Sequence, residues 1–85
     1  MAQIKRLVDK DEDDFTLNEP MTAYQFVKGY LCHRHKELAS YLLENDGSIR
    51  PIILIFHGSE RVGSESQKFL QDEDIVTIMP PITGG

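Results

Sequence analysis

The sequence predicts an α+β domain in which one main helix packs on a mixed sheet of four or five strands. Two kinds of segment support this prediction. A segment with apolar residues at helical spacing begins at Thr22, and strand-like apolar segments lie on both sides of it. Because the whole domain lies between the first and the last of these strands, we expect the two to pair in parallel at the centre of the sheet.

Length and composition limit the chain to one small soluble domain. The 85 residues leave no room for two cores, and 40% apolar with 27% charged residues is ordinary for a globular protein. A net charge of −5 argues against a nucleic-acid or membrane surface and favours a partner with a basic face. The longest apolar run, residues 52–56, is far short of the ~20 residues of a membrane span. A single cysteine, Cys32, and no apolar signal segment behind Met1 predict a cytoplasmic protein.

The N-terminal part of the chain predicts a β-hairpin. Residues 3–8 are a candidate strand, and residues 15–17 have strand propensity as well. Between them, residues 9–14 carry five acidic side chains in six positions, so the sequence predicts an exposed loop of mutually repelling charges. We expect residues 11–14 to contribute little to folding. A calcium site is not expected, because the run lacks the glycine and the bidentate glutamate of a calcium loop.

The clearest local signals predict a helix over residues 22–32. Thr22 is a good N-cap, and Gln25 three residues later completes a capping box. Gly29 weakens a helix by about 1 kcal/mol relative to alanine, so we expect another element to pack closely against it. The apolar side chains at helical spacing are Phe26, Val27, Tyr30 and Leu31.

A second, shorter helical segment is predicted over residues 36–43, and the turn-forming residues 45–47 end it. His33 and His35 lie between the two helical segments. At a spacing of two they point to different sides of a helix, so they do not form a metal-binding pair. A site formed by these two histidines and the distant His57 is improbable, and we predict no metal site.

No catalytic group can be identified in this chain. Cys32 follows Leu31 on the predicted helix, where a free cysteine is more often a small buried apolar residue than a nucleophile. The sequence contains no Ser/His/Asp or Cys/His arrangement and no glycine-rich loop for a phosphate. We therefore predict that the protein is not an enzyme and holds no cofactor of its own.

Two further strands are predicted in the C-terminal half. Residues 52–56 are apolar on both faces, which is typical of a central strand, and either Ile53 or Ile55 is expected beneath the helix. A turn at residues 57–61 is expected to lead to a short partner strand that begins at Val62.

The last strand is predicted at residues 75–79, after an acidic turn at residues 72–74. In the irregular crossing before that turn, Phe69 and Leu70 are the apolar residues, and we expect both to pack beneath the core. Residues 1–79 would thus form the folded domain.

Residues 80–85 form a C-terminal arm with a different character. The two prolines cannot donate to a sheet ladder and hold the chain extended, and the two glycines let backbone thread a narrow channel. The reactive group at the tip is the α-carboxylate of Gly85. An ordinary frayed terminus is the alternative interpretation. The arm reads Pro80-Pro81-Ile82-Thr83-Gly84-Gly85.

In this order of elements the chain resembles the ubiquitin-like β-grasp sulfur carriers, the MoaD/ThiS family. Its tail is most similar to that of the small subunit of molybdopterin synthase. The resemblance is carried by the arm at residues 80–85, by the acidic turn at residues 72–74 leading into residues 75–79, and by the apolar helix from Thr22. The passage at residues 43–50 is similar to that of carriers in cysteine and methionine pathways. The sequence therefore does not decide whether the sulfur goes to these pathways, to the molybdenum cofactor or to thiamine.

The resemblance implies a carrier function. In the family, a partner similar to ubiquitin-activating enzymes uses ATP and Mg²⁺ to adenylate the terminal glycine, here Gly85, which then becomes a thiocarboxylate. The nucleotide and the metal belong to that partner, and Pro80 to Gly84 would lie in its channel. Sulfur would come from a donor and pass to a downstream biosynthetic enzyme. One alternative is a ubiquitin-like modifier joined to lysines through Gly85, and another is an interaction domain whose tail has no role.

Overall fold

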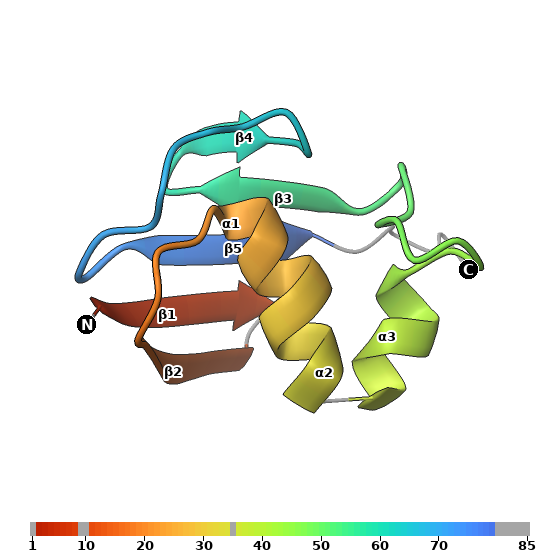
Figure 1. The fold of residues 1–85 in the computed structure, drawn as a ribbon, viewed down its shortest axis with the longest axis horizontal. Helices are drawn as coiled ribbons and strands as arrows, with labels where there is room; N and C mark the ends of the chain where they lie inside the picture. Colours follow the sequence, from red (N-terminus) through yellow and green to blue (C-terminus); the bar gives the residue numbers. More distant parts are fainter. Residues whose placement is uncertain (1, 9–10, 35, 80–85) are drawn as a thin grey trace.

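In the computed structural model, which describes residues 2–8, 11–34 and 36–79, a layer of helices covers one face of a five-stranded sheet (Figure 1). The strand order is β2-β1-β5-β3-β4. β1 and β5 pair in parallel at the centre, and the other neighbours are antiparallel. The predicted α+β class is thereby confirmed. The elements are β1 (Ala2–Val8), β2 (Asp11–Leu17), α1 (Ala23–Gln25), a π-helical segment η1 (Phe26–Leu31), α2 (Cys32–Arg34), α3 (Lys36–Leu42), β3 (Leu54–His57), β4 (Glu60–Val62) and β5 (Ile75–Met79).

The N-terminal hairpin is confirmed, but its acidic residues 11–14 are not a loop. They belong to β2, an edge strand paired along its length with β1. The acidic side chains are exposed, as expected, while the backbone still forms the ladder. Cross-strand cations also reduce the repulsion: Arg6 lies 2.8 Å from Asp13, and Lys5 lies 3.9 Å from Glu12. The loop prediction was wrong because it counted the charges of one strand without those of its neighbour.

The predicted capping box is present at the start of the main helix. The Gln25 N–H donates to the Thr22 hydroxyl at 3.1 Å, and the Thr22 N–H donates to the Gln25 side chain at 3.0 Å. From there α1, η1 and α2 follow one another without a gap through residues 23–34 (Figure 1). The π-helical middle was not predicted. Gly29 lies exposed within it, and an added Cβ would meet nothing within 4 Å, so the expected close packing against Gly29 is wrong.

The hydrophobic core lies between the helices and the sheet. Cys32 is part of it, which confirms the prediction that it is a small buried residue, and this burial raises the pKa of its thiol. The predicted second helix and the turn after it are also present. The buried members of the core are Ile4, Leu17, Ala23, Phe26, Val27, Leu31, Cys32, Leu42, Ile49, Ile53, Ile55, Leu70, Val76 and Ile78.

The strand predicted at residues 52–56 is shifted toward the C-terminus. The Ile53 N–H donates to the Arg50 carbonyl at 2.9 Å, so the chain turns before β3 begins. Ile52 lies on this turn and is 60% exposed. Ile53 and Ile55 are both buried, so the expectation that one of them supplies the core holds for each.

The turn between β3 and β4 is tighter than predicted. Only Gly58 and Ser59 separate the two strands, and Gly58 has a φ of 66°, which favours glycine. Farther along the chain, Leu70 is buried but Phe69 is 50% exposed, so only one of the two packs beneath the core. The turn at residues 72–74 and the last strand are confirmed.

Candidate functional site

The predicted site residues, which are Pro80, Pro81, Ile82, Thr83, Gly84 and Gly85, lie outside the described residues. The structure instead describes the point from which they follow. That point is Met79, the last residue of β5, the strand that lies between β1 and β3. In the register of the sheet, Met79 is opposite Leu54 of β3. The sequence of the arm therefore begins directly after the central strand.

The sheet face opposite the helices carries an apolar surface around that point. Along β5, Val76 and Ile78 are buried, so the alternate residues Ile75, Thr77 and Met79 point to the other face. Their partners in the neighbouring strands share that face with them. All of these side chains are exposed or half-buried. Lys5, the partner of Ile75, lies at the edge of this face. We call the rest of the surface the open face; it consists of Leu7, Leu54, Phe56, Ile75, Thr77 and Met79.

Charged residues border the open face on both sides. On the β2 side, Lys5 and Glu12 form an exposed pair at 3.9 Å, and on the β4 side Arg61 lies opposite Phe56. An apolar centre with a charged border is the usual anatomy of a protein–protein interface. The arrangement suits the docking of another protein beside Met79.

Sequence reasoning did not identify the open face, although a signal for it exists. Residues 52–56 and residues 75–79 are apolar at both even and odd positions, and for residues 52–56 this pattern predicted a central strand covered by the helix on one side and partly covered on the other. Within the described chain the helices cover only one side (Figure 1). Apolar residues on the second side of β3 and β5 therefore indicate a surface for a partner.

A buried histidine and an aspartate form a second polar feature. Nε2 of His57 lies 2.6 Å from Oδ2 of Asp74, and the Gln71 N–H donates to the same oxygen at 2.7 Å. Burial alone would raise the pKa of Asp74, but these hydrogen bonds and the nearby His57 outweigh it, so the pKa is lowered. Among the described residues no partner exists for the buried Nδ1 of His57.

The histidine–aspartate pair is not positioned for chemistry on the arm. Asp74 precedes β5, whereas the arm follows Met79, and at about 3.3 Å per residue the strand separates them by more than 13 Å. A metal is not expected there either, because no group of three or more His, Cys, Asp or Glu side chains is placed to hold an ion in the described part of the chain. His35, one of the histidines considered from the sequence, lies outside that part.

The fold, with a mixed sheet grasping one main helix, defines a ubiquitin-like β-grasp domain, and solved structures confirm this class. Two crystal structures of small archaeal modifier protein 1 (SAMP1) from Haloferax volcanii superpose with TM-scores of 0.81 and 0.79. They cover 99% and 96% of this chain and 100% of their own, at 16% sequence identity. The solution structure of the Haloferax volcanii protein HVO 2177 gives a TM-score of 0.72 at 19% identity, over 99% of this chain and 87% of that one.

At such low identity these likenesses show the fold, and they confirm at that level the resemblance found in the sequence. No protein-family model and no curated protein matches the chain. In the described residues, no helix combines the length and the apolar character that crossing a membrane requires.

Proposed function

We propose that this protein is a sulfur carrier whose C-terminal glycine, Gly85, is activated by a partner enzyme and converted to a thiocarboxylate. The observation that carries the proposal is the junction at Met79. There the central strand of a β-grasp sheet ends beside an apolar open face and is followed in sequence by two prolines and, at the end, two glycines. The arm has the chemistry of a substrate, and the open face has that of a docking surface.

The proposed reaction has two steps. A carboxylate oxygen of Gly85 attacks the α-phosphate of ATP, pyrophosphate leaves, and an acyl-adenylate forms. Hydrosulfide released by the donor then attacks the acyl carbon, AMP leaves, and loss of the remaining proton gives the thiocarboxylate. ATP and Mg²⁺ are held by the activating enzyme, so this chain needs no cofactor or catalytic side chain of its own.

The role of this chain is to place one carboxylate accurately. Docking of the open face would hold the domain, and the arm of residues 80–84 would span the distance to the nucleotide. The glycines suit a channel that admits only backbone. Such positioning is most of what this reaction requires, because it turns an encounter between molecules into a reaction within a complex. We place the reaction in the cytoplasm, where a downstream biosynthetic enzyme would accept the sulfur.

A second candidate function is conjugation to proteins. It is favoured by the likeness of the fold to small archaeal modifier protein 1. In this case the amine of a target lysine would attack the activated Gly85, and an isopeptide bond would form. Activation of the same carboxylate precedes both outcomes, so the two functions share their first step.

The test of activation is ATP–pyrophosphate exchange with the ubiquitin-activating-like enzyme of the same organism. Deleting Gly85 moves the carboxylate back by ~3.5 Å. Exchange should then fall by on the order of 100-fold or more, since an error of about 1 Å already costs that much. Gly84→Ala should also impair exchange, whereas Thr83→Ser should be tolerated. Thermal melting of all three variants should match the parent. If the Gly85 deletion exchanges as well as the parent, both candidate functions fail.

Mass spectrometry separates the two candidates. A carrier isolated with its activating enzyme and a sulfur donor should gain the mass difference between one sulfur and one oxygen, on a peptide that ends at Gly85. A modifier should instead produce a ladder of conjugates on a denaturing gel, which the Gly85 deletion abolishes. Repeating the first measurement with candidate acceptor enzymes of the molybdenum-cofactor, thiamine and cysteine or methionine pathways identifies the pathway by loss of the thiocarboxylate.

A further inference from the structure

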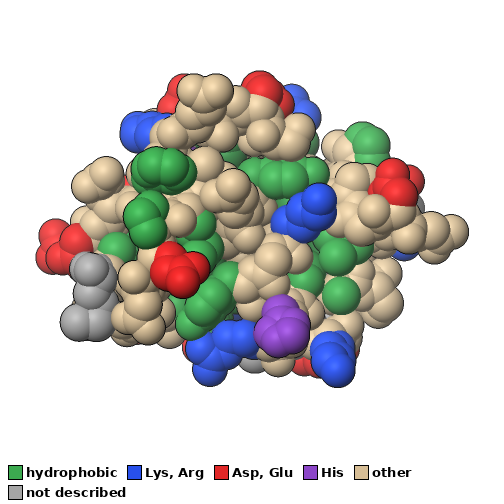
Figure 2. Space-filling model, viewed as in Figure 1, with side chains coloured by type: hydrophobic (Ala, Val, Ile, Leu, Met, Phe, Trp, Pro, Cys, Tyr) green, Lys and Arg blue, Asp and Glu red, His purple; other side chains and the backbone are tan. Residues whose placement is uncertain are grey.

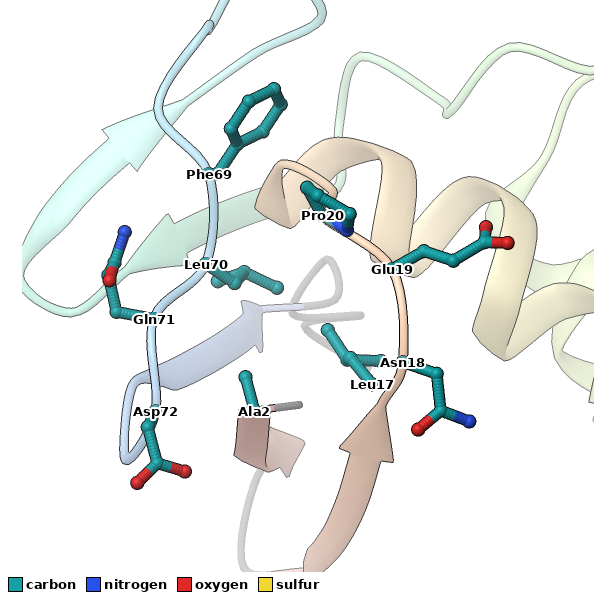
Figure 3. A pocket seen from close by; sticks show the side chains of 9 residues that line it. All are labelled: Ala2, Leu17, Asn18, Glu19, Pro20, Phe69, Leu70, Gln71 and Asp72. Carbon is teal, nitrogen blue, oxygen red and sulfur yellow. The ribbon is translucent and has the colours of Figure 1, made fainter.

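A groove lies at the end of the sheet from which β5 starts, opposite the end where the arm begins (Figures 1 and 3). It is enclosed by residues 17–20, which connect β2 to the main helix, and by residues 69–72, which precede β5. Its volume is about 380 Å³. Neither the proposed activation of Gly85 nor the open face makes use of it.

The lining of the groove mixes polar and apolar atoms, and its apolar part includes two buried leucines. Leu17 and Leu70 are buried and point into the space between the two segments (Figure 3). The Leu70 N–H donates to the Met21 carbonyl at 2.8 Å, so a backbone hydrogen bond joins the two walls. The shape of the groove is therefore set by the backbone of the folded domain and not by mobile surface side chains.

Two large apolar residues remain partly uncovered at the rim. Pro20 is exposed, and Phe69 is 50% exposed although it adjoins the buried Leu70. Figure 3 places both at the same end of the groove. An exposed aromatic ring beside a hollow is a typical anchor point for a partner, because covering the ring removes a large apolar area from water.

Acidic groups stand on both walls. Glu19 belongs to one segment and Asp72 to the other, and both carboxylates lie outside the space between the segments, with that of Glu19 pointing away from it (Figure 3). One oxygen of Asp72 accepts a hydrogen bond from the Gln3 N–H at 2.8 Å, which fixes that carboxylate at the rim. The net charge of −5 adds to the negative potential. An anionic ligand such as a nucleotide is therefore disfavoured here.

We propose that this groove docks a short extended segment of a second protein in which an apolar side chain is flanked by lysine or arginine. The apolar side chain would enter the hollow over Leu17 and Leu70 and cover Phe69, and the cations would reach the carboxylates of Glu19 and Asp72. A volume near the lower end of the ~300–1,000 Å³ typical of ligand pockets suits one or two side chains. Because the groove is remote from Met79, this segment can bind while the arm is engaged elsewhere.

The test is an NMR titration of the ¹⁵N-labelled protein with the end-capped peptide Gly-Arg-Leu-Arg-Gly at millimolar concentration. The proposal predicts saturable shifts of amides in residues 17–19 and 69–72. Two matched peptides separate its elements: Gly-Arg-Gly-Arg-Gly keeps the charge without the apolar side chain, and Gly-Glu-Leu-Glu-Gly reverses the charge. Both should bind at least about tenfold more weakly, which corresponds to 1.4 kcal/mol.

Variants assign the contact to the groove. Phe69→Ala should weaken binding of the first peptide about tenfold, and Glu19→Gln should weaken it about threefold and increasingly so at low salt. Tyr41→Ala and Glu44→Gln change an equally exposed aromatic and an exposed carboxylate elsewhere, and they should leave binding unchanged. If Phe69→Ala fails to fold, the comparison of peptide binding by Glu19→Gln and by Glu44→Gln decides whether the peptide binds in the groove. The proposal is overturned by the absence of saturable shifts, by equal binding of the glycine-centred peptide, or by shifts confined to the acidic strand β2.

Discussion

Nε2 of His57 lies 2.6 Å from Oδ2 of Asp74, and this contact joins the end of β3 to the turn that leads into β5. An ionised carboxylate can only accept, so the imidazole donates. The same turn is held to β1 by backbone hydrogen bonds of Lys5 to Asp74 at 3.0 Å and of Glu73 to Gln3 at 2.8 Å. The turn thus connects three strands of the sheet and sets the position at which β5 begins.

Asp74→Asn should destabilise the protein by about 1–2 kcal/mol at neutral pH, since two charge-assisted hydrogen bonds become neutral ones. The pKa of Asp74 is lowered from its ordinary value of 3.8 because the hydrogen bonds from Gln71 and His57 outweigh burial, which alone would raise it. A lowered pKa stabilises the folded state above the ordinary value, and this contribution is lost as the pH falls through 3.8 and below. The free energies of unfolding of parent and variant, measured in urea, should therefore become equal in acid. A difference that persists unchanged there, or an equal effect of the exposed Glu60→Gln, contradicts this account.

Ile55→Ala should cost about 2–5 kcal/mol, because the side chain is buried and its removal leaves a cavity beneath the main helix. Ile52→Ala is the matched control, since Ile52 is exposed on the preceding turn and its truncation should change stability by less than about 0.5 kcal/mol. The measurement is the free energy of unfolding in urea. Similar losses for the two variants would show that β3 does not begin where the structure places it.

Asp11→Asn and Asp13→Asn should differ in their effect on stability, although the sequence alone predicts the same small effect for both. Asp13 accepts from Arg6 at 2.8 Å, and the Arg6 side chain is only 12% exposed, so the lost partner leaves a largely buried cation. We expect Asp13→Asn to cost up to about 1 kcal/mol, and Asp11→Asn to be neutral or slightly stabilising because it relieves repulsion. Melting at low salt should separate the two variants, and equal melting temperatures would mean that the ion pair contributes nothing.

Gly29→Ala should stabilise the protein by roughly 0.5–1 kcal/mol. The substitution reduces the conformational entropy of the unfolded chain, and in the folded protein the new methyl group meets nothing within 4 Å. Thermal and urea unfolding measure the gain. A loss of stability would instead indicate that the π-helical segment requires glycine at this position.

Met79→Asp should impair activation without affecting the fold, because Met79 lies on the open face beside the arm and is 47% exposed. We expect pyrophosphate exchange to fall at least about tenfold, since a charge would enter the apolar centre of the proposed interface. Tyr41→Asp, at a residue of α3 with 51% exposure, is the control and should exchange normally. Normal exchange by Met79→Asp would exclude the open face as the docking surface, and the proposal for Gly85 would then stand or fall on its own test.

The features that could be predicted from the sequence are those set by neighbouring residues. Thr22 and Gln25 lie three apart and cap the helix through their own backbones, and residues 75–79 form a strand directly after an acidic turn. These local signals sufficed for the α+β class and the capped helix, and the order of the elements along the chain sufficed for the parallel pairing of the first and last strands. The role of residues 80–85 stays a prediction from the sequence.

The remaining features depend on which segments become neighbours. Residues 11–14 form a strand because β1 supplies hydrogen bonds and two cations across the ladder. His57 and Asp74 are 17 positions apart and meet only because β3 pairs with β5. The open face and the groove exist because the helices cover one side of the sheet and because residues 17–20 lie beside residues 69–72. Such contacts reflect long-range pairing, which the pattern of any single segment does not encode.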